Sequence, residues 1–146
     1  MKQMFLTFAI LLSFLSTAAV ADNERLITFN ELPKAAQTFL NTYYADATIQ
    51  YYKVKVCASL IVYTANFTEG REVQFDSGGH WTTVKSRKTP IPDGIIPTKI
   101  KNFVRAQFPA NTILRIEHNS RLYEATLDNN IEITFNRSQR AIDINY

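Results

Sequence analysis

Apolar and polar residues alternate through residues 63–84, the spacing of strands with one buried face. The alternation is interrupted at Gly70 and again at Gly78 and Gly79, which can adopt the positive φ of tight hairpin turns. This stretch therefore predicts an antiparallel meander of short strands. Its first two strands have apolar residues at Tyr63, Ala65, Phe67, Val73 and Phe75.

The same alternation returns over residues 123–135, where Tyr123 takes the place of Tyr63. Few of the matched positions are identical, so the match is mainly one of pattern. We interpret the chain as a tandem duplication, with repeats at about residues 27–86 and 93–146.

Each repeat opens with apolar residues spaced three and four apart, the stripe of an amphipathic helix. The first helix is predicted over residues 30–44, with Asn30 as its N-cap and Pro33 in its first turn. Ile96 and Pro97 repeat the start of this helix, which predicts a second helix at the start of the second repeat.

These elements predict an α+β fold of two tandem repeats, each with one helix followed by a four-stranded antiparallel sheet. The first strand is residues 49–56, which are rich in Tyr and Val. A helix with one apolar stripe covers one face of a sheet, so the helices are expected to pack on one sheet face and leave the other open. The proline-rich residues 86–97 are expected to link the repeats.

The N-terminus has the pattern of a signal peptide. Lys2 precedes an uncharged apolar run at residues 4–15, and an A-x-A cleavage pattern ends at Ala21. The run is shorter than the roughly 20 apolar residues that span a bilayer. Residues 1–21 are therefore expected to be removed, leaving residues 22–146 as one periplasmic or secreted domain without stable membrane insertion.

Composition narrows the function further. The net charge of the chain is +3, too mild to indicate nucleic-acid binding. Lys85, Arg87 and Lys88 form a short basic cluster, which is expected to be a solvated linker. Cys57 is the single cysteine, so no intrachain disulfide forms, and its apolar neighbours favour a buried small hydrophobe.

No catalytic motif is found. The two histidines, His80 and His118, lack the spacing of metal ligands, and nucleophile-elbow, dinucleotide and phosphate-loop motifs are missing from the sequence. Glu69, Glu72 and Asp76 lie close enough in sequence for acid–base work or Ca²⁺ binding, but hairpin turns use such residues for local hydrogen bonds. We therefore expect that the protein is not an enzyme and uses no cofactor or metal.

Strand parity predicts which side chains lie on the open face. Ile142 and Ile144 are expected to be core positions, so Trp81, which aligns with Ala141, is expected to point away from the helices. The alternative is burial of Trp81 at an end of the sheet or under the linker. Trp and Tyr are favoured anchors of protein interfaces. The predicted partner-binding residues are Trp81, Tyr51, Lys53, Glu72, Gln74 and Arg115.

A Phe-Asp-x-x-Gly-x-Trp turn is formed by Phe75, Asp76, Gly79 and Trp81. With the helix and strand pattern around it, this turn resembles the PepSY-like proteins of bacterial envelopes, which are similar in architecture to the β-lactamase inhibitor protein. The resemblance implies a binding or inhibitory module. β-Lactamase inhibition is not implied, because no inhibitory loop can be matched. The second repeat departs from the motif, with Asn136, Gln139 and Ala141 at the Asp, Gly and Trp positions.

The expected function is therefore an exported, non-enzymatic, protein-binding or inhibitor-like module of the cell envelope. Its unknown partner, an envelope protein or peptide, is expected to bind on the open sheet face. The alternative is a carrier of a small molecule, a sugar or a lipid, in the cleft between the repeats. There Tyr51 and Trp81 would stack on a ring.

Overall fold

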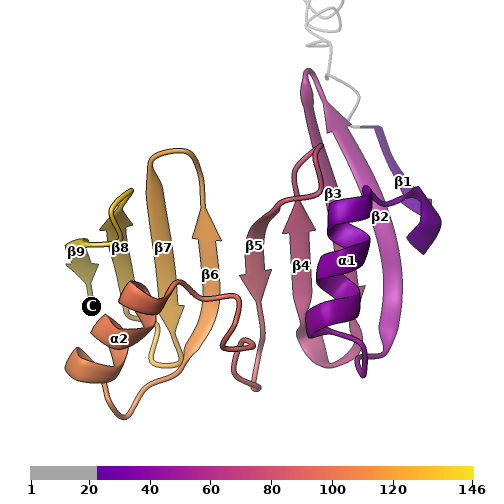
Figure 1. Ribbon diagram of the computed structural model, residues 1–146. Helices are drawn as coiled ribbons and strands as arrows, with labels where there is room; N and C mark the ends of the chain where they lie inside the picture. Colours follow the sequence, from indigo (N-terminus) through magenta and orange to yellow (C-terminus); the bar gives the residue numbers. More distant parts are fainter. Residues whose placement is uncertain (1–22) are drawn as a thin grey trace, which may run out of the picture.

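The computed structural model describes residues 23–146, in which nine strands and two α-helices form an α+β fold. The predicted signal peptide lies outside the described residues. The strand order in the sheet follows the chain, and every neighbouring pair is antiparallel (Figure 1). The strands are β1 (Asn23–Ile27), β2 (Ile49–Cys57), β3 (Leu60–Phe67), β4 (Glu72–Phe75), β5 (Trp81–Lys85), β6 (Ile113–His118), β7 (Leu122–Leu127), β8 (Glu132–Asn136) and β9 (Ala141–Asn145).

The two separate sheets expected from the sequence are one continuous sheet. Strand β5 pairs directly with β6, with Thr83 opposite Glu117 and Val84 opposite Ile116. The α+β class and the antiparallel pairing are as predicted. The halves of the sheet are joined at β5 and β6 by backbone pairing.

Both helices begin immediately after a proline. Helix α1 spans Lys34–Tyr43 and helix α2 spans Thr98–Gln107, with Pro33 and Pro97 as their N-caps. The predicted cap at Asn30 is wrong, since a 3₁₀ turn at Phe29–Glu31 and an extended Leu32 precede α1. A proline disfavours helical geometry in the residue before it, so the helix starts after the Leu-Pro pair.

The helices lie on the same face of the sheet (Figure 1). In α1, the Phe39 ring meets the Phe75 ring of β4 edge-on, with centroids 5.5 Å apart. In α2, Phe103 meets Phe135 of β8 in the same way, at 5.6 Å. Edge-to-face pairs of this kind are worth about 1 kcal/mol beyond the buried area. None of the helices in residues 23–146 is long and apolar enough to cross a membrane.

The core lies beneath the helices. A continuous line of completely buried side chains runs across six strands, each residue opposite the next. Burying a Val or Ile side chain contributes about 2 kcal/mol, so this line holds the two halves of the sheet together. The line consists of Ala65, Val73, Val84, Ile116, Ala125 and Ile133.

Strand β1 was not predicted. It pairs with β2 at the edge of the sheet, and in its sequence, Asn-Glu-Arg-Leu-Ile, Ile27 is the one residue that is buried. An edge strand with one face solvated carries too weak an apolar pattern to be recognised. Because β1 precedes α1 as β5 precedes α2, the boundaries of the proposed repeats are not fixed by the element order.

Candidate binding surface

The face of the sheet opposite the helices carries two rows of mainly polar side chains, which we call the open face. Within each row, neighbouring residues are cross-strand partners, and they alternate along the strands with the buried line of the core. The first row is Leu26, Lys53, Thr64, Gln74, Thr83, Glu117, Glu124, Thr134 and Asp143. The second row is Tyr51, Asn66, Glu72, Lys85, Arg115, Thr126, Glu132 and Asn145.

Most of the residues predicted to bind a partner lie in these two rows. Tyr51, Lys53, Glu72, Gln74 and Arg115 are all on the open face, as strand parity predicted. Their role in binding stays a prediction.

The placement of Trp81 was wrong. Gln74 pairs with Thr83, but Phe75 pairs with Trp81, so Thr82 is an extra residue in a β-bulge. Cross-strand partners point to the same face, so Trp81 lies with the buried Phe75 on the helix-covered face. It is half-buried and packs against the core.

A second bulge, in β9, explains why the parity argument placed Trp81 on the wrong face. In β9, Asp143 pairs with Thr134 and Ala141 pairs with Phe135, leaving Ile142 as the extra residue of a second bulge. Ile142 is 56% exposed and is not a core position, whereas Ile144 packs against the core as expected. A register count that starts from Ile142 therefore assigns residues on the far side of the bulge to the wrong face.

Asp76 and Gly79 give the Phe-Asp-x-x-Gly-x-Trp motif a structural role. The Asp76 carboxylate accepts hydrogen bonds from the backbone N–H groups of Gly78 and His80, each at 2.9 Å. Gly79 has φ +83°, and a Cβ there would lie 2.8 Å from the backbone nitrogen of Ala36 in α1. The motif therefore holds the β4–β5 turn against the start of the helix.

The β8–β9 turn is similar in shape but is built from different residues. The Asn136 side chain accepts a hydrogen bond from the backbone N–H of Arg140 at 3.0 Å. Gln139 has φ 63°, the left-handed conformation that Gly79 has in the first turn. The departures from the motif at Asn136 and Gln139 thus preserve the backbone shape.

Two basic residues face each other on the open face. Lys85 of β5 is directly opposite Arg115 of β6. Each has an acidic neighbour, since the Lys85 Nζ lies 3.3 Å from a Glu72 oxygen and Arg115 donates to Glu117 at 2.6 Å. Glu72 is largely covered, with 15% of its side chain exposed.

Two acidic residues face each other beside this basic pair. Glu117 of β6 is directly opposite Glu124 of β7. Burial raises the pKa of Glu124 above its ordinary value, and the negative charges of Glu117 and Glu132 raise that pKa further. The open face therefore has a negative strip next to a positive one.

Lys53 is anchored near the other end of the open face. Its Nζ donates to the Glu24 carboxylate at 3.0 Å, and this hydrogen bond raises the pKa of Lys53. The same Nζ lies 6.0 Å from the centre of the Tyr51 ring, a cation–π geometry. The lysine is thereby held close to the surface of β2.

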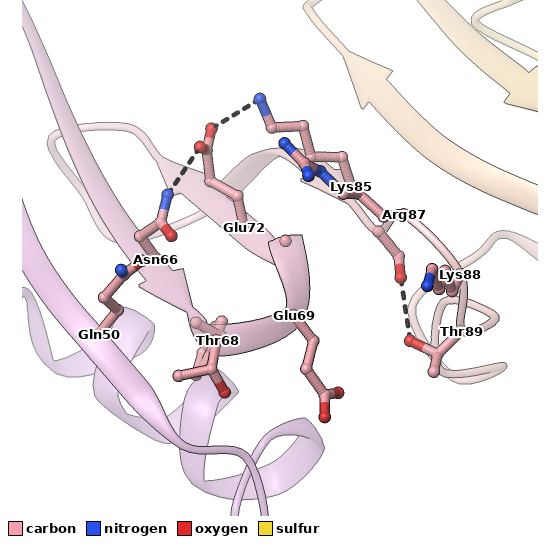
Figure 2. A pocket seen from close by; sticks show the side chains of 12 residues that line it. Gln50, Asn66, Thr68, Glu69, Glu72, Lys85, Arg87, Lys88 and Thr89 are labelled. Atoms are coloured by element: carbon pink, nitrogen blue, oxygen red, sulfur yellow. Dashed lines mark hydrogen bonds and ion pairs between the residues drawn. The ribbon is translucent and has the colours of Figure 1, made fainter.

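A pocket of about 970 Å³ adjoins the open face (Figure 2). It lies between the β3–β4 turn at Thr68–Gly70 and the segment after β5, residues 86–89. Arg87 and Lys88, expected to be part of a solvated linker, line this pocket. The sequence alone did not indicate the pocket, because it is formed by two turns that are brought together by strand pairing. We call it the basic pocket; it is lined by Gln50, Asn66, Phe67, Thr68, Glu69, Gly70, Glu72, Lys85, Ser86, Arg87, Lys88 and Thr89.

The two histidines make local contacts. The Nε2 of His118 lies 2.7 Å from the Trp81 carbonyl oxygen, and because a carbonyl can only accept, this nitrogen is the donor. His80 is exposed, with Nδ1 3.4 Å from an Asp76 oxygen.

Cys57, predicted to be buried, is half-buried.

The acidic residues considered for calcium, Glu69, Glu72 and Asp76, are not brought together. Within residues 23–146, no group of three or more His, Cys, Asp or Glu side chains is placed to hold a metal ion. Glu72 accepts from Asn66 and Gln74, and Asp76 closes its own turn.

Several solved structures resemble this fold over most of the chain, and three are described here. A "putative periplasmic protein" of the DUF2874 family from Bacteroides vulgatus is 33% identical, with TM-score 0.83, and the match covers 86% of this chain and 99% of the other. A "putative calcium-regulated periplasmic protein" from Bacteroides thetaiotaomicron is 30% identical, with TM-score 0.82, covering 84% and 97%. A third periplasmic protein from B. vulgatus, described as of unknown function, shares the fold at 23% identity and TM-score 0.80, covering 85% and 100%.

All three are described as periplasmic, which confirms the location expected from the sequence. A comparison with curated proteins found no match. Residues 62–143 match the family model described as "Putative beta-lactamase-inhibitor-like, PepSY-like". This match includes the turn formed by Asp76, Gly79 and Trp81. The chain therefore belongs to the PepSY-like family.

Proposed function

We propose that this chain is a non-enzymatic periplasmic binding module whose open face holds a protein or peptide partner. The helices cover one face of a nine-stranded sheet and leave the other uncovered. The family description, which is inhibitor-like, supports a binding role over a catalytic one.

The observation that carries the proposal is the pairing of like charges on this face. Lys85 is opposite Arg115, and Glu117 is opposite Glu124. Like charges directly across a strand pair destabilise the sheet, by about 0.2–1 kcal/mol for each pair. Folding alone would favour opposite charges at these positions. Glu72 and Glu117 partly offset the charges of Lys85 and Arg115. A partner of complementary charge would offset the repulsion that remains, so the arrangement suits binding.

The strips also favour selectivity. Positive and negative strips lie side by side across β5, β6 and β7, so a partner must present both charges in the right order. Complementary charges of this kind raise association rates and suppress wrong partners more than they raise affinity. We expect binding that weakens with added salt.

We also propose that the fold is a tandem repeat. The bulges support this, because they occur at matching places in the two halves. The register shifts between Ile49 and Tyr51 in β2 and between Ile113 and Arg115 in β6. In both cases the shift lies between the first and third residues of the strand that follows a helix. The bulges opposite Phe75 and Phe135 form a second matching pair.

The carrier alternative has less support. It requires Tyr51 and Trp81 to stack on one ring, but Tyr51 lies on the open face and Trp81 on the helix-covered face. The basic pocket is lined mainly by polar and charged residues, unlike the mainly apolar sites that hold lipids.

The test is capture from a periplasmic extract on immobilised protein, with bound species quantified by mass spectrometry. Two double variants are compared with the natural chain, and each replaces two charged side chains with glutamine. The first combines Lys85→Gln with Arg115→Gln, and the second combines Glu117→Gln with Glu124→Gln. We expect a defined species to be captured by the natural chain and lost with both variants.

The matched control removes one lysine and one arginine outside the open face, by combining Lys99→Gln in α2 with Arg137→Gln in the β8–β9 turn. This control should retain the captured species. Equal capture by the natural chain and both open-face variants would refute the proposal.

A further inference from the structure

The basic pocket extends the open face, because Glu72 and Lys85 belong to both. Figure 2 shows Lys85, Arg87 and Lys88 along one side of it, and Asn66, Glu72 and Thr68 across from them. A ligand on the second row of the open face therefore reaches the pocket without leaving the surface.

Arg87 and Lys88 are exposed and have no acidic partner among the described residues. Lys85 forms an ion pair with Glu72. The Glu72 carboxylate also accepts hydrogen bonds from the side chains of Asn66 at 3.2 Å and Gln74 at 2.9 Å. The charge of Glu72 is thus compensated from within, whereas the charges of Arg87 and Lys88 are not.

The other acidic residue of the lining, Glu69, does not compensate them. Figure 2 shows its side chain directed away from Arg87 and Lys88, and Glu69 forms no ion pair within residues 23–146. The positive side of the pocket therefore remains available to an anion.

The backbone around Arg87 is held in place. A Cβ at Gly70 would lie 2.5 Å from the Cδ of Arg87, so the arginine stem rests directly on this glycine. The backbone N–H of Ser86 donates to the Leu114 carbonyl at 2.7 Å, and the Ser86 and Thr89 hydroxyls hydrogen-bond at 3.0 Å. Arg87 is presented from an anchored turn.

We propose that the basic pocket binds the carboxylates of an acidic peptide segment, and that Arg87 and Lys88 are the residues that contact these carboxylates. This inference rests on the proposed function, since the segment belongs to the partner held on the open face. Arg recognises a carboxylate through two parallel hydrogen bonds, and Lys adds a point charge. A volume of about 970 Å³ suits several residues of a peptide better than a single small ion.

The experiment measures fluorescence anisotropy of a labelled hexaglutamate peptide, with hexaglutamine as the neutral probe. The full mature chain should bind hexaglutamate and not hexaglutamine. The double variant Arg87→Gln with Lys88→Gln should lower the affinity for hexaglutamate about tenfold or more. Both side chains are exposed, so the variant should melt at the same temperature as the natural chain by circular dichroism.

The Lys99→Gln and Arg137→Gln control removes the same charge outside the pocket and should retain the affinity. An equal loss in this control, or binding of hexaglutamine as tight as that of hexaglutamate, would overturn the inference. So would competition by inorganic phosphate at the same concentration as glutamate residues, since that would mark a general anion site.

A further variant separates this inference from the proposed function. Arg115→Gln changes the open face outside the pocket. If it abolishes hexaglutamate binding while the Arg87 and Lys88 variant does not, the pocket assignment is wrong and the open-face proposal stands. If hexaglutamate does not bind at all, the pocket assignment is wrong and extract capture decides the proposed function separately.

Discussion

Trp81 and His118 contact each other across β5 and β6, with ring centroids 4.4 Å apart and planes at 80°. The His118 ring in turn stacks on Tyr123, at 5.2 Å. The backbone carbonyl of Trp81 accepts the hydrogen bond from His118. This cluster joins the two halves of the sheet on the helix-covered face, so Trp81 has a structural role.

Trp81→Ala should therefore lower the free energy of unfolding, by about 2 kcal/mol. Full burial would predict a larger loss of about 3–5 kcal/mol, but the ring is half-buried. Urea denaturation measures the change, and Trp81→Phe should retain most of the stability. An unchanged stability together with loss of partner capture would place Trp81 in the binding surface after all.

Gly79→Ala should destabilise the fold by about 3 kcal/mol, because it combines left-handed backbone strain with a contact to α1 that cannot relax. The new Cβ would lie 2.8 Å from backbone of the helix. Gly78→Ala is the adjacent control, since its Cβ would meet the exposed His80 ring at 3.1 Å, and it should change stability by about 0.5 kcal/mol or less. Equal effects of the two substitutions in urea denaturation would contradict this role of Gly79.

Glu124→Gln should stabilise the protein at pH 7, by about 0.5 kcal/mol, because it removes the repulsion from Glu117. The folded state holds the Glu124 proton more tightly than the unfolded state, since its folded pKa is raised. Its ionisation therefore costs stability as pH rises from about 4.5 through the folded pKa.

The gain should accordingly disappear at about pH 3.5, where the glutamate is protonated in both states. Paired thermal or urea unfolding at the two pH values measures it. Asp46→Asn, in the exposed turn after α1, should show no comparable gain at pH 7. A variant that is less stable than the natural chain at pH 7 would mean that Glu124 is favourably paired.

Tyr44→Phe should protect the fold at high pH. Burial raises the pKa of Tyr44 to about 12 from 10.0, while the Arg71 charge partly opposes this shift. Between these values the unfolded chain loses the phenolic proton and the folded chain keeps it, so the natural protein loses stability as pH rises.

Phenylalanine removes this loss and keeps the stacking on Phe67, where the ring centroids are 4.8 Å apart. The stability difference between Tyr44→Phe and the natural chain, measured by urea denaturation, should grow from pH 9 to pH 11. A constant difference would indicate that Tyr44 ionises normally in the folded state.

Alternation and period were sufficient to predict most elements and most of the open face. Glu72 and Arg115 were placed correctly because no bulge separates them from the core residues that set their parity. Trp81 and Ile142 were misplaced because a bulge adds a residue without leaving a mark in the pattern.

The remaining features depend on long-range contacts. The solvated edge strand β1 has little apolar signal of its own. Arg87 lies on Gly70 because β4 pairs with β5, and Lys85 meets Arg115 because β5 pairs with β6. Neither juxtaposition can be inferred from local sequence, since both follow from the order of strands in the sheet.

Site-specific photo-crosslinking in living cells tests the open face most directly. A photoreactive amino acid is placed at Thr83, in the central strand β5 of the open face, or at Asn41, exposed on α1 over the opposite face. We predict a discrete crosslinked product from Thr83 that is lost on combining Lys85→Gln with Arg115→Gln, and no product from Asn41. A product from Asn41 and none from Thr83 would contradict the account.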